Sequence, residues 1–263
     1  SIISKESLKI VNATKGVVAE NAINITKNFY PRMFKNNPEV FQYFNKSNQR
    51  AGAQPRALAD SIIAYAVNIE HLENLGGVVE RVAHKHCVLN IQAEDYQIVH
   101  DNLMASIAEV LGDAVTPEVG AAWSEAVMAL AKILIETEGN LYKSTAEQKG
   151  GWMGKREFEV TKRTQEADEI VSLELSPTDK GDIMSFAPGQ YISVSVNPTK
   201  EKYFAPRHYT ITSQPGAASY RITPKILHGE EGSPDGIVSE YLNSLKEGDK
   251  VDLFPPFGPA GFN

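Results

Sequence analysis

Cysteine is almost absent from this chain of 263 residues, which contains only Cys87. A single thiol cannot form an intrachain disulfide, and metal sites built from several cysteines are excluded by count. Chains that make no use of disulfides are typical of reducing compartments, so we expect a cytoplasmic protein.

Long apolar runs and an excess of basic charge are also lacking. No stretch approaches the ~20 apolar residues that a membrane-spanning helix requires. The first residues, SIISKESLKIV, have neither the basic region nor the apolar core of a signal peptide, so we expect none and no stable membrane insertion. The formal net charge of −7 makes the chain a poor partner for nucleic acid.

The periodicity of the sequence changes at Gly150-Gly151. Before this pair the apolar residues recur at the 3.6-residue spacing of helices, and after it they form short alternating runs separated by Pro and Gly. The change predicts an all-α domain over residues 1–148 and a second domain over 149–263. In the first domain we expect seven or eight helices, two of which are capped by Ser4 and Asn21, and a late one that begins at Thr116-Pro117.

The second domain is predicted to be a small antiparallel β-barrel, because its strands are short and turn residues separate them. One short helix is expected at residues 238–242. Pro224 falls inside one predicted strand, which favours an edge position for that strand. The predicted strands are 157–161, 170–175, 191–196, 208–212, 220–225 and 250–254.

Two histidines lie in the helical stretch VVERVAHKHC, and only one is predicted to face inward. Positions i, i+3, i+4 and i+7 share one helix face, which here holds Val79, Val82, Ala83 and His86. His84 falls off this face, so we expect it in solvent. An inward imidazole needs a hydrogen-bond partner or a metal, and the pattern alone does not choose between them.

Several local motifs lie at consistent spacing through the whole chain. In the first half they are NFYPRMF at Asn28–Phe34, a long stretch at Tyr43–Leu58, VERVAHKH at Val79–His86 and WSEAVMALA at Trp123–Ala131; in the second they are PGQY at Pro188–Tyr191, RHYT at Arg207–Thr210 and VSEYL at Val238–Leu242. Together these motifs resemble those of flavohaemoglobins, a family of nitric oxide dioxygenases. The resemblance implies a globin fold followed by an FAD-binding barrel of the ferredoxin-reductase type.

On one side of a haem, the resemblance implies that His86 is the ligand of the iron. Glu138 and Tyr96 match the residues that support this histidine, and an anionic partner would make the imidazole more electron-donating. Glu136 lies close to Glu138 in sequence, and the pattern does not choose between the two.

On the opposite side of the haem, the resemblance implies a hydrogen-bonding pocket for oxygen. Tyr30 and Gln54 match the residues whose polar groups face the sixth coordination position. Phe44 matches the aromatic residue that packs on the haem, and Leu58 matches the leucine above the iron.

In the second half, the resemblance implies FAD contacts along two strands. Arg207 would pair with a phosphate of FAD through its planar guanidinium group. Tyr209 would stack near the flavin ring, and Thr210 would place its hydroxyl close to a ring nitrogen. Gln190 and Tyr191 would contact the flavin and the adenine or ribose side of the cofactor.

Three further residues complete the expected FAD site. His208 belongs to the same RHYT motif as Arg207. Val238 and Ser239 open the short helix, whose N-terminus suits the pyrophosphate. Nothing in the chain matches the Gly-rich turn of a dinucleotide-binding fold, so we expect the NAD(P)H site of the family to lie in a third domain outside this sequence.

The function implied by the resemblance is oxidation of nitric oxide by O2 to nitrate, which detoxifies nitric oxide. Electrons would pass from NAD(P)H through FAD to the iron of haem b. Two alternatives stay open: a haem-based sensor of O2 or nitric oxide, and a flavin reductase of ferric iron or quinones with an ancillary globin. We expect a monomer, and only slow reduction by NADH of the chain as given.

Overall fold

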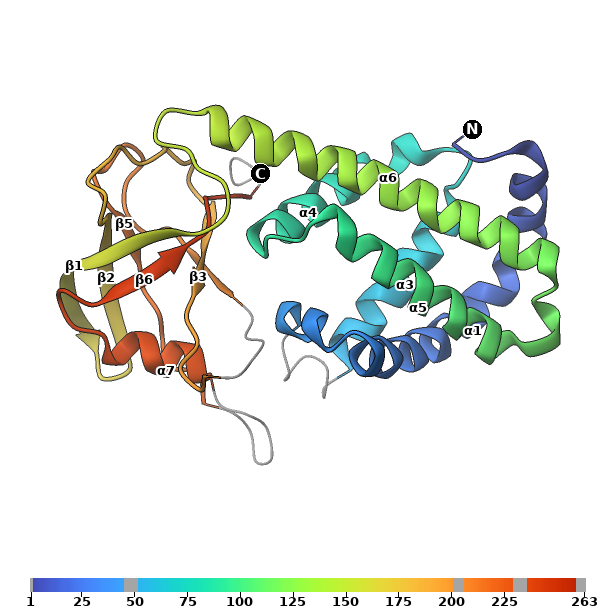
Figure 1. Cartoon of the computed structure of the whole chain (residues 1–263), viewed down its shortest axis with the longest axis horizontal. Coiled ribbons are helices and arrows are strands. Elements are labelled where there is room, and N and C mark those ends of the chain that lie inside the picture. Colours follow the sequence, from blue (N-terminus) through green and yellow to red (C-terminus); the bar gives the residue numbers. More distant parts are fainter. Residues whose placement is uncertain (1, 45–51, 201–205, 229–235, 259–263) are drawn as a thin grey trace. The chain divides into compact units, whose positions relative to one another are not determined.

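The computed structural model describes residues 2–44, 52–200, 206–228 and 236–258 (Figure 1). Residues 45–51 of the Tyr43–Leu58 motif therefore lie outside the described residues. The chain forms two compact units. One contains Ser1–Val79 and Gln92–Thr137, and the other contains Glu80–Ile91 and Glu138–Asn263.

The first part of the chain is helical, as the periodicity predicts. Its α-helices are α1 (Lys5–Asn36), α3 (Ala53–Val67), α4 (Gly76–Val88), α5 (Ala93–Leu111) and α6 (Pro117–Glu147), and short 3₁₀ turns lie at Pro38–Tyr43, Leu72–Leu75 and Gly112–Ala114. None of the helices in the described ranges is both long enough and apolar enough to cross a bilayer.

Two of the three predicted helix starts are confirmed. The Ser4 hydroxyl accepts the Ser7 N–H (3.2 Å) at the start of α1, and the Thr116 hydroxyl accepts the Val119 N–H (3.2 Å) at the start of α6. The helix start at Asn21 is wrong, because α1 runs through it without a break. The Asn21 side chain donates to the Val17 carbonyl one turn earlier, so it does not cap a new helix.

The core of the first unit follows the helical spacing of α1. Ile25, Phe29 and Met33 recur every fourth residue and are fully or almost fully buried. On α6, Trp123 is buried as well, and its indole N–H donates to the Thr14 hydroxyl (2.8 Å), which satisfies the one polar atom of that side chain. Burial of each such apolar side chain stabilises the fold by about 1.5–3 kcal/mol.

The second part of the chain forms one antiparallel sheet with a short helix, as predicted. The elements are β1 (Arg156–Ala167), β2 (Ile170–Pro177), β3 (Tyr191–Ser195), β4 (Arg207–Thr210), β5 (Tyr220–Ile222), α7 (Ile237–Ser244) and β6 (Lys250–Leu253). The strand order is β4-β3-β6-β1-β2-β5. β5 is thus an edge strand within the described residues, and it ends two residues before Pro224.

The sheet curls, because its two edge strands approach each other. The Thr212 N–H, just after β4, donates to the carbonyl of Arg221 in β5 (2.8 Å). The inner face carries a continuous apolar core that includes Leu173 of β2, Ile192 of β3 and Leu242 of α7. The predicted small antiparallel barrel is confirmed.

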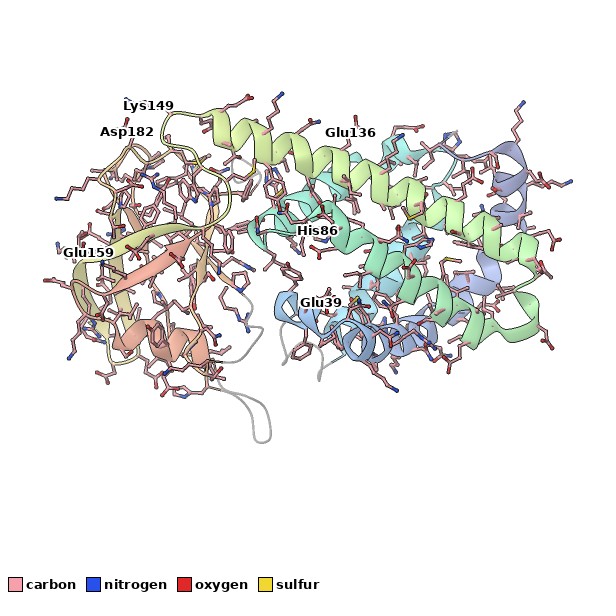
Figure 2. All side chains as sticks on the ribbon, in the orientation of Figure 1. Glu39, His86, Glu136, Lys149, Glu159 and Asp182 are labelled. Atoms are coloured by element: carbon pink, nitrogen blue, oxygen red, sulfur yellow. The ribbon has the colours of Figure 1, made fainter. Side chains whose placement is uncertain are left out.

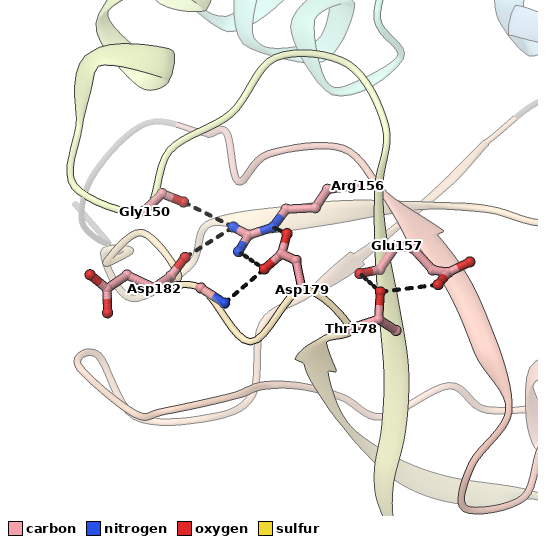
Figure 3. Close-up of polar contacts among 7 residues, drawn as sticks. Gly150, Arg156, Glu157, Thr178, Asp179 and Asp182 are labelled. Carbon is pink, nitrogen blue, oxygen red and sulfur yellow. Dashed lines mark hydrogen bonds and ion pairs between the residues drawn. The ribbon is translucent and has the colours of Figure 1, made fainter.

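An arginine joins the first strand of the barrel to the loops beside it (Figure 3). The Arg156 guanidinium donates two hydrogen bonds to the Asp179 carboxylate (2.9 and 2.8 Å) and others to the carbonyls of Gly150 (3.3 Å) and Asp182 (3.0 Å). These bonds to Arg156 lower the pKa of Asp179 to about 2. Gly150 has φ +75°, and a Cβ there would lie 2.4 Å from the Ile183 carbonyl carbon, so only glycine fits.

Candidate functional site

One of the two histidines of α4 does not lie as the helical pattern predicts. The His86 side chain is 32% exposed, whereas the His84 side chain is buried and only 10% exposed. The prediction that His84 lies in solvent is therefore wrong. Its Nδ1 accepts the Gly258 N–H (2.9 Å) from 174 positions further along the chain, a partner that helix periodicity cannot reveal. Burial lowers the pKa of His84, so the ring is neutral and can accept this bond.

His86, which Figure 2 labels on α4, is paired with a buried carboxylate. Its Nδ1 lies 2.6 Å from Oε1 of Glu138, which is 3% exposed on α6, whereas Glu136 is exposed. An ionised carboxylate can only accept a hydrogen bond, so the imidazole carries its N–H on Nδ1 and its lone pair on Nε2. A partly exposed imidazole oriented in this way by a buried anion is a donor set that fits haem iron.

Side chains of α4 and α6 also hold the backbone near His86. The Tyr142 hydroxyl, one turn after Glu138 on α6, donates to the Ile91 carbonyl (2.7 Å) and lies 3.5 Å from the His86 carbonyl. The Cys87 thiol lies 3.7 Å from the Glu138 carbonyl. Sequence analysis missed Tyr142, although its position four residues after Glu138 puts both on one face of α6.

Tyr30 lies in an aromatic cluster of the first unit. It is buried on α1, and its ring centroid lies 5.0 Å from that of Phe29, 5.9 Å from Phe34 and 5.5 Å from Phe44. The structure thus brings Tyr30 and Phe44 together. Burial raises the pKa of the Tyr30 hydroxyl, so it stays a neutral hydrogen-bond donor at every physiological pH.

The other residues expected in the oxygen pocket or in support of His86 belong to α3 and α5. Gln54 is the second residue of α3, as its position before Pro55 predicts, and it is half-buried. Leu58 lies one turn later on the same helix and packs against the core of the first unit. Tyr96 is buried on α5. The roles of all three stay predictions.

The expected FAD residues of β3 and β4 lie next to each other in the sheet. Tyr191 pairs with Thr210, and Ile192 pairs with Tyr209. Because paired residues share a face, Tyr191 and Thr210 lie on one side, whereas Arg207 and Tyr209 lie on the side of the barrel core. β4 is an edge strand of the sheet within the described residues.

The charge on this edge suits an anion. Burial lowers the pKa of Arg207, which still leaves a cation at neutral pH because an unperturbed arginine titrates far above it. The pKa of His208 is lowered by burial and then by the charges of Lys85 and Arg207, so its ring is neutral. A guanidinium group on a half-buried strand is well suited to a phosphate of FAD.

Gln190 and Tyr191 of the PGQY motif also hold the protein's own backbone. The Gln190 side chain accepts the Ala187 N–H (2.8 Å) and donates to the Gly258 carbonyl (3.0 Å). The Tyr191 N–H and carbonyl each bond to Phe257 (3.0 Å for both). The Tyr191 ring lies 5.3 Å from that of His208. The contacts with Phe257 and Gly258 are further features that sequence analysis missed.

Val238 and Ser239 lie in the first turn of α7, as expected. Val238 packs in the barrel core. The Ser239 hydroxyl donates to the Gly236 carbonyl (2.8 Å) and accepts the Leu227 N–H (3.1 Å). Because both side chains are engaged inside the protein, the groups suited to an anion here are the main-chain N–H groups at the helix N-terminus.

Comparison with known families and proteins agrees with this architecture. Residues 27–134 match the globin family model, and residues 157–262 match the model of the oxidoreductase FAD-binding domain. The flavohemoprotein of Halalkalibacterium halodurans is 42% identical over 257 residues, which are 97% of this chain and 62% of that protein.

Solved structures give the same picture. The flavohemoglobin of Malassezia yamatoensis, which contains bound FAD and haem, superposes with a TM-score of 0.81 at 31% identity, over 97% of this chain and 64% of its own. A proposed nitric oxide dioxygenase from Rhodothermus marinus, engineered as a carbene transferase, is 28% identical with a TM-score of 0.51, over 55% of this chain and 99% of its own. This chain thus spans less than two thirds of the length of the Halalkalibacterium flavohemoprotein and of the Malassezia flavohemoglobin. By sequence and by fold, it belongs to the flavohaemoprotein family.

Proposed function

We propose that this chain is the haem and flavin part of a nitric oxide dioxygenase, which oxidises nitric oxide with O2 to nitrate and thereby removes it. As a flavohaemoprotein the chain binds haem and FAD. Its electrons would come from NAD(P)H, through a segment of the longer protein that its relatives represent. We also propose that the boundary between its two domains lies at residues 148–149.

The observation that carries this proposal is the 2.6 Å bond between His86 and Glu138. A buried carboxylate increases the electron density on the imidazole, and a more electron-donating ligand stabilises the higher oxidation states of iron. That property favours oxygen chemistry over reversible oxygen storage. Tyr96 is proposed to belong to the same supporting group.

Tyr30 is proposed as the hydrogen-bond donor to the oxygen substrate. Its hydroxyl is neutral, and the rings of Phe34 and Phe44 restrict where it can point. A donor held in place before the reaction stabilises negative charge as it develops, at no cost of reorganisation. Gln54 is proposed as a second polar group of this pocket, Leu58 as its apolar wall and Phe44 as the packing partner of the haem.

The edge formed by β3 and β4 is proposed to hold FAD. Arg207 would bind a phosphate, Tyr209 would pack against the flavin ring and Thr210 would direct its hydroxyl to a ring nitrogen. Gln190, Tyr191 and His208 would line the same edge, and the main-chain N–H groups of Val238 and Ser239 would receive the pyrophosphate. The FAD held by these residues would supply both two-electron and one-electron redox chemistry.

The test is consumption of nitric oxide by the full-length protein under aerobic conditions with NADH. We expect one nitrate formed for each nitric oxide consumed, and no consumption when O2 or NADH is omitted. Quinone and ferric reduction are measured at the same NADH supply. A protein that reduces quinones rapidly but does not consume nitric oxide is a flavin reductase, and one that binds haem ligands without any turnover is a sensor; either result overturns the proposal.

A further inference from the structure

His84 makes a contact that the proposed function does not use. It lies two residues before His86 on α4, is buried, and accepts the Gly258 N–H at its Nδ1 (2.9 Å). Glu80 lies one turn before it, with Oε1 4.0 Å from His84 Nε2. Both partners of the bond belong to the same compact unit of the structure. In the sequence, however, His84 lies in the helical half of the chain and Gly258 lies in the half that forms the sheet.

The segment Phe254–Gly258, here called the strap, contacts not only His84 but also Gln190 and Tyr191, which belong to the edge proposed to bind FAD. Phe257 exchanges two backbone hydrogen bonds with Tyr191, and the Gly258 carbonyl accepts a bond from the Gln190 amide (3.0 Å). Gly258 has φ +124°, and a Cβ at this position would lie 2.9 Å from Tyr191 Cε1. The backbone here is therefore fixed against the PGQY motif at a distance that only glycine permits.

Apolar contacts reinforce the same junction. Cys87 and Val88 of α4 form a buried cluster with Phe257 of the strap, and Tyr142 packs edge-on against Phe257 with ring centroids 5.8 Å apart. The charge of Lys85 also acts on His208 of β4. A continuous series of contacts thus leads from the helix of His86, through His84 and the strap, to Gln190 and Tyr191.

We propose that His84 is a positioning residue for electron transfer between flavin and haem. Its bond to Gly258 fastens the strap, and with it the Gln190–Tyr191 edge, to the helix that carries His86. This inference rests on the proposed function. In the step concerned, reduced flavin loses one electron and ferric haem iron gains it to become ferrous, with no bond formed or broken between them. The rate depends on how closely and how rigidly the two groups are held.

The test compares His84→Leu, which removes the acceptor, with His84→Gln, which keeps an acceptor oxygen, in the full-length protein. His71→Leu, an exposed histidine 72% accessible at its side chain, is the control. Stopped-flow absorption under anaerobic conditions follows reduction of flavin by NADH and then of haem by flavin. We expect His84→Leu to slow the second step roughly tenfold and to spare the first, and His84→Gln to stay within roughly twofold of the wild type. Unchanged flavin-to-haem transfer in His84→Leu, at normal haem and FAD content, overturns the proposal.

A second measurement needs no turnover, and its wild-type part needs no folded variant. Amide hydrogen exchange of Gly258 is followed in the wild-type protein and in both His84 variants, with ferrous haem bound to carbon monoxide. We expect protection in the wild type and in His84→Gln, and loss of protection in His84→Leu. Rapid exchange of Gly258 in the wild type contradicts the bond even if His84→Leu does not fold. If the flavin-to-haem step behaves as expected but the wild type consumes no nitric oxide, the positioning role stands and the proposed function fails.

Discussion

The surroundings of His86 and those of Tyr30 are built in opposite ways. His86 is fixed by a short bond to a carboxylate that is almost completely buried. Tyr30 is fixed by three aromatic rings with centroids 5.0–5.9 Å away, and its hydroxyl is kept neutral by burial. The first arrangement would supply charge to the proposed iron ligand, and the second would supply a hydrogen-bond donor in an apolar setting. Substitutions in the two regions should therefore change different observables.

The largest effect is expected from His86→Ala. Loss of the proposed iron ligand should remove most of the haem, because even residues that only support a metal ligand change metal affinity by about 10–100-fold and a ligand itself must contribute more. FAD content should stay normal, since the edge proposed to bind FAD lies on β3 and β4 and not on α4. Haem and FAD are measured by extraction and absorption. Normal haem content in His86→Ala would show that another side chain binds the iron.

The next effect is expected from Tyr30→Phe. The aromatic contacts are kept and only the hydroxyl is lost, so the thermal unfolding midpoint and haem content should change little. Nitric oxide consumption by the full-length protein should fall by roughly 10²–10³-fold, the usual cost of removing one donor to developing charge. Phe29→Leu, which alters packing but keeps the hydroxyl, is the control. Unchanged consumption by Tyr30→Phe means that the donor role assigned to it is wrong.

Glu138→Gln should give a smaller effect of a different kind. The variant keeps an oxygen acceptor for His86 but removes the negative charge, so haem should stay bound while its electronic properties change. We expect nitric oxide consumption to fall by roughly 10–100-fold and the iron–histidine stretching frequency in resonance Raman spectra to decrease. Glu136→Gln is the matched control, because Glu136 is exposed on the same helix. If the two substitutions have equal effects, the charge of Glu138 has no special role at His86, and the contrast with the apolar surroundings of Tyr30 fails.

The smallest effect is expected at a carboxylate that is paired at the surface. Asp179 is paired with Arg156 but exposed, and its pKa is lowered to about 2 from an unfolded value near 3.9. Its contribution to stability is therefore present above about pH 4 and is lost as the pH falls through about 2. The gap in thermal unfolding midpoint between wild type and Asp179→Asn should be small at pH 6 and should shrink in that range. A gap that grows on acidification contradicts this assignment.

Sequence alone predicted the two fold classes and most element positions, because apolar spacing and local caps such as Ser4 and Thr116 decide them within a few residues. It failed where local signals compete. Asn21 is a common capping residue, but the helix continues through it because apolar residues on both sides keep the same face buried.

Long-range partners were beyond the sequence for a physical reason. The pattern of α4 selects an inward face, but it does not contain the Gly258 N–H that draws His84 into a buried position. In the same way, Glu136 and Glu138 differ little in local pattern, and only the packing of α6 determines which carboxylate reaches His86. The resemblance to a family was needed to name the residues, and the geometry was needed to see what holds them.

The central claim is that His86, supported by Glu138, binds the iron, whereas His84 binds no iron and instead holds the strap beside the edge proposed to bind FAD. The most direct measurement is the Soret band of the ferrous carbon monoxide form, recorded at equal protein concentration for the wild type, His86→Ala and His84→Leu. We predict a full band in the wild type and in His84→Leu and a band almost lost in His86→Ala, with flavin absorption in all three. A band that survives in His86→Ala and disappears in His84→Leu would contradict the account.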